Sequence, residues 1–187
     1  VASLAAEALA EGTRSRDAVS LTDTFEQLGG SLDTGVTWTH AECSTTVLTR
    51  RLPEALRLLA EVAREPAFPE GEVTRLREER LAELLQQRTE PRGLADDMFA
   101  RFCFSAASRY ARSEGGDEET VARVTRDAVV AHHARYMVPS RSRLIVVGDV
   151  DVDGFLAEVE QPRAVRHLAV GLGDGCGIEQ HLLDLFV

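Results

Sequence analysis

The chain has 187 residues, of which 44% are hydrophobic, so it is long enough to bury the core of one domain. Its formal net charge of -10 excludes the broad basic surface that binding to nucleic acid or to anionic lipid requires. The three cysteines, Cys43, Cys103 and Cys176, form neither a disulfide framework nor a Cys-x-x-Cys metal pair, which favours a reducing compartment.

The first thirty residues predict two helices. Residues 1–10 are rich in Ala and Leu, and Gly12 follows them at a position typical of a helix end. Ser15 or Asp17 can cap the second helix, because a side-chain oxygen there accepts a hydrogen bond from the first turn. Gly29 and Gly30 then end that helix, since glycine is a poor helix former.

Residues 31–51 change to a period of two, which is typical of strands with one buried face. We therefore expect two antiparallel strands, joined by a turn near residues 39–41. The alternating positions are Leu32, Thr34, Val36 and Trp38 in the first strand, and Cys43, Thr45, Val47 and Thr49 in the second.

Further helices are predicted downstream, and prolines mark several of their ends. One opens at Pro53, and a long charged helix runs over residues 70–88. The next covers residues 94–107, with Met98, Phe102 and Phe104 as apolar positions. Thr125 caps a helix that Pro139 prevents from continuing.

The end of the chain divides into a strand and a segment of different composition. Residues 144–147 are a β-branched run of the kind that fills a buried strand, and a short helix can follow from Asp151 or Asp153. Residues 161–187 carry several glycines, and we interpret them as a linker or tail after a domain spanning residues 1–160.

The middle strands join as a hairpin, and this argues against a doubly wound parallel sheet. The pattern instead predicts an α+β fold in which helices pack on one face of a mostly antiparallel sheet. The chain lacks an initiator Met and opens directly on a helix, so we expect it to begin inside a domain whose first strands precede Val1.

Several landmarks occur in the order found in one family. They are Gly12-Thr13; the run Glu26-Gln27-Leu28-Gly29-Gly30-Ser31-Leu32; Pro66-Ala67-Phe68-Pro69-Glu70; Ser108-Arg109-Tyr110 followed by Gly115-Gly116; and residues 125–151. In these features the chain resembles the pitrilysin/insulinase-like zinc peptidases, the family that includes mitochondrial processing peptidase. The resemblance implies an α+β domain that pairs with a second, similar domain.

The resemblance also implies where zinc would be held in an active member. The family's inverted His-x-x-Glu-His motif lies on the helix before the Gly-Thr landmark, and a Glu from the long charged helix completes the site. Counting back from Gly12, the first His position falls on Ser3, the Glu on Ala6 and the second His on Glu7. Glu83 aligns with the third ligand. We therefore predict no catalytic residue, no metal ligand set and no cofactor in this chain.

Other residues invite a functional interpretation, and each has a simpler one. His132 and His133 are adjacent, so they point about 100° apart on a helix and do not chelate together easily; we expect half-exposed helix residues. His40 is expected to be a polar turn residue. Residues 171–177 have alternating glycines but lack the strand–loop–helix context of a phosphate loop.

The sequence leaves the roles of two carboxylates and one loop undecided. Glu7 and Glu83 can bind a hard cation if they face each other, but pairing with arginine or with solvent is the simpler expectation. On the long helix, Arg75 and Glu79 form an attractive pair four residues apart. The Arg109-Tyr110 loop is either a structural turn or a segment that faces substrate.

The first functional hypothesis is a non-catalytic subunit or half of a zinc peptidase, which forms a peptide-binding chamber with a zinc-bearing homologous partner. An extended peptide would bind as an added strand at a sheet edge. The alternatives are a scaffold without a proteolytic role, and a residual metallopeptidase that uses Glu83 and substituted ligands.

The expected partners are thus a homologous zinc-bearing subunit or second domain, and an extended peptide, but not nucleic acid or a membrane. We expect a dimer, and we expect a cytoplasmic location, with the periplasm left open because a targeting segment can precede Val1.

The sequence contains no lysine, so all 21 of its Lys and Arg residues are arginine. We expect this bias of a GC-rich bacterial genome.

Overall fold

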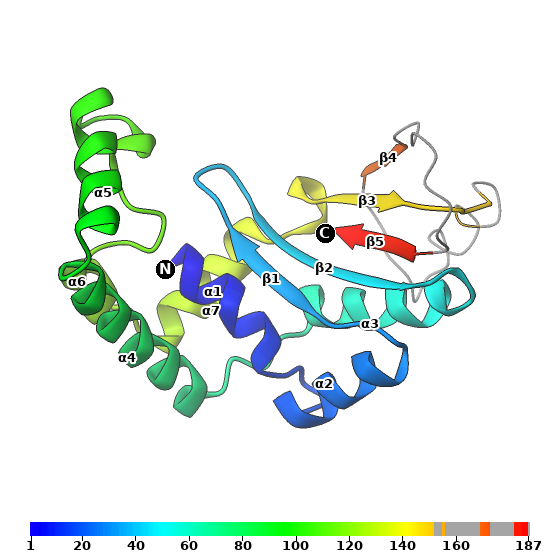
Figure 1. Cartoon of the computed structure of the whole chain (residues 1–187). Helices are drawn as coiled ribbons and strands as arrows, with labels where there is room; N and C mark the ends of the chain where they lie inside the picture. Colours follow the sequence, from blue (N-terminus) through cyan, green and yellow to red (C-terminus); the bar gives the residue numbers. More distant parts are fainter. Residues whose placement is uncertain (152–154, 156–168, 173–181, 187) are drawn as a thin grey trace.

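A five-stranded sheet flanked by helices forms the centre of the molecule (Figure 1). A computed structural model describes residues 1–151, 155, 169–172 and 182–186. The principal elements are α1 (Ala2–Glu7), η1 (Ala8–Glu11), α2 (Ala18–Gln27), β1 (Asp33–Val36), β2 (Ala41–Leu48), α3 (Leu52–Arg64), α4 (Glu70–Gln87), α5 (Pro91–Cys103), η3 (Arg109–Ala111), α6 (Glu118–Ala122), α7 (Arg126–Tyr136), β3 (Arg143–Val147), β4 (Ala169–Leu172) and β5 (Leu182–Phe186). The α+β prediction is confirmed.

The sheet is mostly antiparallel, with the strand order β1-β2-β5-β3-β4. The pairs β1–β2, β2–β5 and β3–β5 are antiparallel, and β3–β4 is parallel. In the predicted hairpin, Asp33 pairs with Ser44 and Val36 with Ala41. Within the described residues, β1 pairs with β2 alone and is an edge strand.

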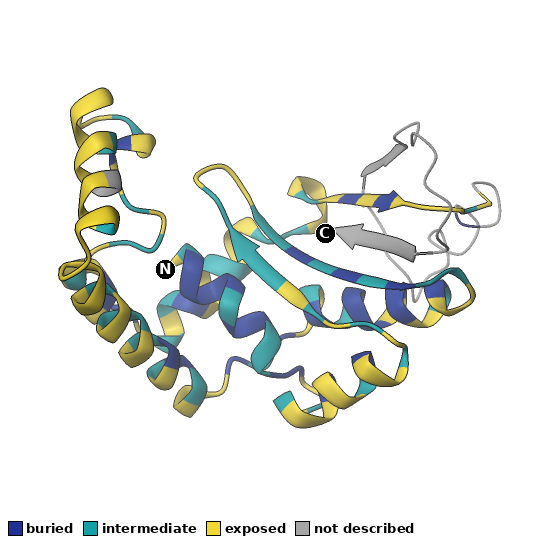
Figure 2. Cartoon of the chain, in the orientation of Figure 1, coloured by how far each residue is buried: buried dark blue, intermediate teal, exposed yellow. Residues whose placement is uncertain are grey.

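The burial pattern of β2 shows which face of the sheet the helices cover. Cys43, Thr45 and Val47 are buried, whereas the residues between them are half-buried. Helices α1 and α3 pack against this part of the sheet, and α7 packs behind α1. Buried residues concentrate in α1 and on the inner side of α3, while α5 is exposed along most of its length (Figure 2). The core therefore lies between these helices and β2.

Local signals set most of the element ends. Asp17 caps α2 by accepting a hydrogen bond from the Ser20 N–H at 2.8 Å. Thr125 caps α7 in the same way through Ala128 N–H. Pro53 lies in the first turn of α3, where its missing N–H costs no helical hydrogen bond.

Two glycines are required by the positions they occupy. Gly12 has φ = 112°, and a Cβ there would lie 2.8 Å from the Arg16 carbonyl oxygen. At Gly30 a Cβ would lie 2.3 Å from the Thr46 carbonyl oxygen, so glycine lets the chain pass close against β2. The chain can thus turn from η1 into α2 and from α2 into β1.

Two expectations about apolar segments were wrong. The strand at residues 144–147 is not buried throughout: Leu144 and Val146 are buried, but Ile145 and Val147 face solvent. The helix predicted at residues 94–107 is α5, which begins earlier at Pro91, and its residues Met98 and Phe102 are exposed. In both cases nothing among the described residues covers that face.

The last segment supplies two strands to the sheet. Within residues 161–187, β4 lies at one edge and β5 lies between β2 and β3. The helix expected after Asp151 and the Gly173–Gly177 part of the glycine-rich run fall outside the described residues, Phe155 excepted. Across the described residues, no helix combines the length and the apolar character needed to cross a bilayer.

Candidate functional site

Helices α1 and α4 pack against each other where the sequence comparison placed a metal site. Ser3 and Ala6 of α1 are buried, at 5% and 0% relative exposure. Neither side chain provides an imidazole or a carboxylate, the groups that zinc sites in proteins require at these positions. The side chains that remain on this face are Glu7 of α1 and Glu83 of α4, and the structure shows that both are paired.

Arg80 joins the two carboxylates. Its Nη2 donates to Oε1 of Glu7, and its Nη1 lies 3.1 Å from Oε2 of Glu83. The Arg80 and Glu7 side chains are only 24% and 29% exposed, whereas Glu83 is 62% exposed. The guanidinium therefore acts as a fixed cation between α1 and α4. Its contact with Glu7 is better shielded from water than its contact with Glu83.

The electrostatics of Glu7 reflect its partial burial. Burial raises the pKa of Glu7, the Arg80 guanidinium lowers it through its charge and its hydrogen bond, and the nearby Glu83 and Glu79 carboxylates raise it further. The net pKa lies above the ordinary value. The Arg80 guanidinium thus does not bring the pKa of this carboxyl back to its ordinary value.

The loop before α6 closes over Arg80. A Cβ on Gly115 would lie 3.2 Å from Arg80 Nη1, so the backbone there approaches the guanidinium closely. The Arg80 Nε is buried and has no hydrogen-bond partner among the described residues. We name Arg80, Glu7 and Glu83 the arginine junction; it connects α1 and α4 and contacts the loop through Gly115.

The residues at the arginine junction do not fit a zinc site. They present two carboxylates that both pair with one guanidinium, and no imidazole. Across the described part of the chain, no group of three or more His, Cys, Asp or Glu side chains is arranged to hold a metal ion. Ala6 also offers no carboxylate that could accept a proton from water.

The free edge of β1 is a second candidate site. The Thr37 N–H donates to the His40 carbonyl at 2.8 Å and closes the hairpin turn. Because hydrogen-bonded and non-bonded pairs alternate along an antiparallel hairpin, Thr34 and Val36 direct their N–H and C=O groups away from β2. This edge can accept an added strand.

The hairpin turn beside this edge contacts the 104–112 segment. Trp38, expected inside the first strand, instead lies in the turn, because β1 ends at Val36. Its ring meets that of Tyr110 with centroids 5.7 Å apart, and Tyr110 meets Phe104 at 5.5 Å. Arg109 Nη1 donates to the Trp38 carbonyl at 3.3 Å. The Arg109-Tyr110 loop is therefore packed on the hairpin.

The histidines have structural contacts. His133 Nε2 lies 2.8 Å from the Ala63 carbonyl oxygen and links α7 to α3. His132 is half-buried and stacks on Tyr136 at 4.8 Å, and burial lowers its pKa. His40 is an exposed residue of the hairpin turn, as expected, with Nδ1 3.0 Å from Thr37 Oγ1.

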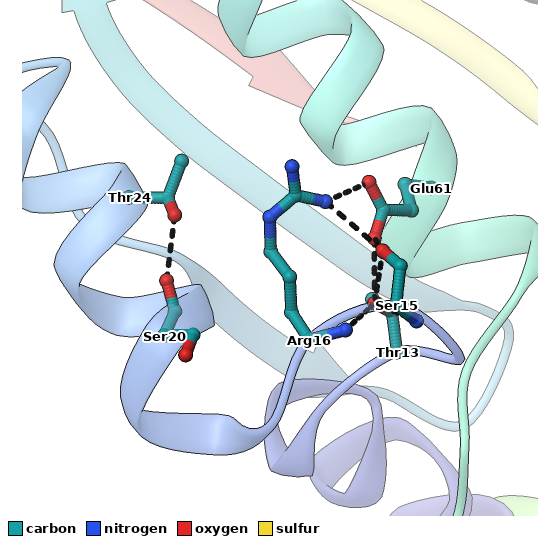
Figure 3. A network of polar contacts seen from close by, with 6 residues as sticks. All are labelled: Thr13, Ser15, Arg16, Ser20, Thr24 and Glu61. Carbon is teal, nitrogen blue, oxygen red and sulfur yellow. Dashed lines mark hydrogen bonds and ion pairs between the residues drawn. The ribbon is translucent and has the colours of Figure 1, made fainter.

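Polar contacts around Glu61 hold the loop after η1 against α3 (Figure 3). Thr13 and Ser15 donate their hydroxyls to Oε1, and Arg16 pairs with Oε2. Burial acts to raise the pKa of Glu61, but these hydrogen bonds and the Arg16 charge outweigh it and leave the pKa lowered. We interpret this network as structural, since all three donors belong to one loop.

Sequence reasoning missed two residues that define these sites. Arg80 stands three residues before Glu83, a spacing that predicts a contact on one helix face, but its contact with Glu7 spans 73 residues and has no local signal. Trp38 fitted the alternating pattern and was therefore assigned to the strand. The expected pair of Arg75 and Glu79 is confirmed, at 2.8 Å.

Comparison with known proteins decides the family. The family model described as Insulinase (Peptidase family M16) matches residues 1–110, more than half of the chain. The chain belongs to this insulinase family. The resemblance inferred from the sequence landmarks is thereby confirmed at the level of the family.

Curated relatives of this insulinase-family chain include uncharacterized zinc proteases from Mycobacterium tuberculosis and Mycobacterium leprae. They are 28% and 27% identical to it over 153 residues. The aligned region covers 82% of this chain, but only 35% and 34% of those relatives. The chain thus spans about a third of the length of the curated relatives it matches.

Solved structures of the family have the same fold. A crystal structure of a peptidase M16 inactive domain from Pseudomonas fluorescens matches 90% of the chain with a TM-score of 0.72 and 23% identity, and the match covers 42% of that structure. The periplasmic protease PqqL from Escherichia coli matches 94% of the chain with a TM-score of 0.71 and 19% identity, over 20% of its own length. At these identities the likeness supports the fold alone.

Proposed function

We propose that this chain is a non-catalytic half or subunit of an insulinase-family peptidase, and that it binds an extended peptide beside a zinc-bearing partner. The observation that carries the proposal is the arginine junction. A guanidinium stands between Glu7 and Glu83, and Ser3 and Ala6 supply neither ligand nor base. A structure described as an M16 inactive domain has the same fold.

Peptide binding is assigned to the free edge of β1. Thr34 and Val36 offer outward N–H and C=O groups, which pair with any extended backbone and so give affinity with little sequence preference. The proposed partner is a homologous zinc-bearing domain, either in the same polypeptide or in a separate chain, since the aligned region covers only 35% of the matched relative.

The first test measures zinc content and peptide cleavage for this chain alone and after mixing with an insulinase-family protein that carries an intact zinc motif and is encoded beside it. We expect no stoichiometric zinc and no cleavage from the chain alone, and faster cleavage in the mixture. Stoichiometric zinc with chelator-sensitive cleavage by this chain alone would instead support a residual metallopeptidase.

The second test blocks the sheet edge. Thr34→Pro removes one outward N–H of β1 without removing a bond of the β1–β2 ladder, since Thr34 belongs to a non-bonded pair. We expect it to abolish binding of a fluorescein-labelled Thr-Ser repeat decapeptide in a polarisation assay, while the control Thr34→Val binds normally. Absence of binding by every form of the protein would favour the scaffold alternative.

A further inference from the structure

Three aromatic side chains gather at the end of β1. Trp38, Phe104 and Tyr110, here called the aromatic cluster, are 42%, 44% and 40% exposed. They come from the hairpin turn and from the segment after α5, about 70 residues apart in the chain. Large aromatic rings usually bury more of their surface than this, so the cluster leaves a considerable apolar area in contact with water.

The aromatic cluster is held in place rather than loosely exposed. The Trp38 indole Nε1–H donates to the Arg112 carbonyl at 2.9 Å, and Arg109 Nη1 donates back to the Trp38 carbonyl at 3.3 Å. The rings of Trp38 and Tyr110 meet edge-on, with an interplanar angle of 63°. Because these contacts fix the rings in the free protein, the protein loses less side-chain conformational entropy on binding a ligand here than it would at a mobile surface.

The cluster also has a defined relation to the free edge. Trp38 lies two residues beyond Val36, the last residue of β1 and one of the two with outward backbone groups. A peptide that adds to β1 and continues past its end reaches the hairpin turn. A side chain of that peptide near the turn can reach the aromatic cluster.

On the basis of the proposed function, we infer that the aromatic cluster is a side-chain subsite that selects extended peptides carrying an aromatic or large apolar residue. The backbone groups of β1 bind the peptide main chain, and the cluster fixes its position along the edge. An added phenyl ring makes edge-to-face contacts with Trp38 and Tyr110, which are worth more than the area they bury. A small or charged side chain gains no such contact.

Trp38 is the single tryptophan of the chain, so its fluorescence reports directly on the subsite. The probes are two Thr-Ser repeat decapeptides, one with a central Phe and one with a central Ala. A repeat peptide can slide along β1, so the Phe can reach the cluster in whichever position binding allows. We expect the Phe peptide to bind about tenfold more tightly and to shift Trp38 emission to the blue.

A matched pair of variants tests the assignment. Tyr110→Ala removes the central ring of the cluster but leaves the indole hydrogen bond to Arg112 in place. Tyr136→Ala removes a tyrosine of nearly the same exposure, 42% against 40%, whose ring contacts His132 on α7 instead. We expect Tyr110→Ala to bind both peptides equally, and Tyr136→Ala to keep the preference for Phe.

The outcomes separate this inference from the function on which it rests. Equal binding of the two peptides by the unmodified protein, or a preference for Phe that survives in Tyr110→Ala, would overturn the subsite and leave the edge-binding function standing. If neither peptide binds, the proposed function fails and the subsite fails with it.

Discussion

At the scale of single residues, Arg80 matters because its one guanidinium pairs with carboxylates of two different helices, Glu7 of α1 and Glu83 of α4. Glu7 is half-buried and depends on this guanidinium for its main attractive contact. Without a cation beside it, a carboxylate in such a position has lost part of its hydration and has no ion pair to compensate for that loss, so it destabilises the folded state.

We therefore expect Arg80→Ala to lower the free energy of unfolding by about 1–3 kcal/mol, since it leaves Glu7 without its partner. Urea denaturation at pH 7 measures this. The matched control is Arg88→Ala, because the Arg88 pair with Glu118 is 67% and 45% exposed, and such surface pairs contribute little. Equal losses in the two variants would show that the arginine junction has no special role.

Glu7 also gives a pH prediction with a definite sign. Its pKa is raised in the folded state, chiefly by burial, so the ionised form costs stability once the pH rises through the folded value. Gln resembles the protonated form. We expect Glu7→Gln to unfold at a higher temperature than the unmodified protein at pH 7, with the difference disappearing below the ordinary pKa of Glu. A lower melting temperature for the variant at pH 7 would contradict the argument.

At the scale of elements, Glu61 joins a loop to α3 and should respond in the opposite way. Burial opposes its ionisation, but bonds from Ser15, Thr13 and Arg16 outweigh burial and lower its pKa. Its contribution is therefore present above the ordinary pKa and is lost as the pH falls through the folded value. Glu61→Gln should lower the unfolding free energy at pH 7 by about 1–2 kcal/mol.

The Glu61 loss should vanish in strong acid, where both forms are neutral. The melting temperature of Glu7→Gln minus that of the unmodified protein should therefore rise with pH, whereas the same difference for Glu61→Gln should fall with pH. If the two differences changed with pH in the same direction, either Glu7 or Glu61 would not have the pKa shift given above.

Sequence patterns predicted the elements well wherever the signal was local. Asp17, Pro53 and Thr125 mark helix starts through bonds or ring constraints within a few residues, and all three act as expected. Hydrophobic residues were less informative, because periodicity tells which residues share a face but not whether another element covers it. Phe102 shows this: it belongs to α5 but is 92% exposed.

The candidate sites depended on contacts between distant segments and were harder to predict. The positions of Ser3, Ala6 and Glu7 came from the family resemblance, counted back from Gly12, and Glu83 came from the same resemblance. The Arg80–Glu7 contact and the Trp38–Tyr110 contact each join residues more than 70 apart, and no local pattern encodes such a pairing.

At the scale of the whole molecule, the described residues expose apolar surface on β3 and on α5 as well as at the aromatic cluster. Ile145 and Val147 of β3 are 43% and 44% exposed, and α5 exposes Met98, Phe99 and Phe102. Apolar surface of this kind marks contact regions, and β1 adds an edge whose backbone groups can pair with another chain. We therefore expect these surfaces to contact another protein chain or domain.

We expect the isolated chain to self-associate at micromolar concentration. Sedimentation velocity measures this, and Phe102→Ser should reduce association while leaving the melting temperature nearly unchanged, because the ring is almost fully in water. The control is Phe25→Ser, which removes a buried core ring and should instead lower stability strongly. A sharp monomer peak for the unmodified chain would refute the expectation.

Because the arginine junction uses a side chain where a metal site uses an ion, it does not depend on the delivery of metal to the protein. A helix crossing held by a metal ion forms only when the cell delivers that ion, and a chelator can take it apart. The crossing of α1 and α4 is held by a cation that ribosomal synthesis builds into the chain itself. Its assembly therefore needs no loading step and is indifferent to metal starvation, even where a metal-dependent partner would stop working.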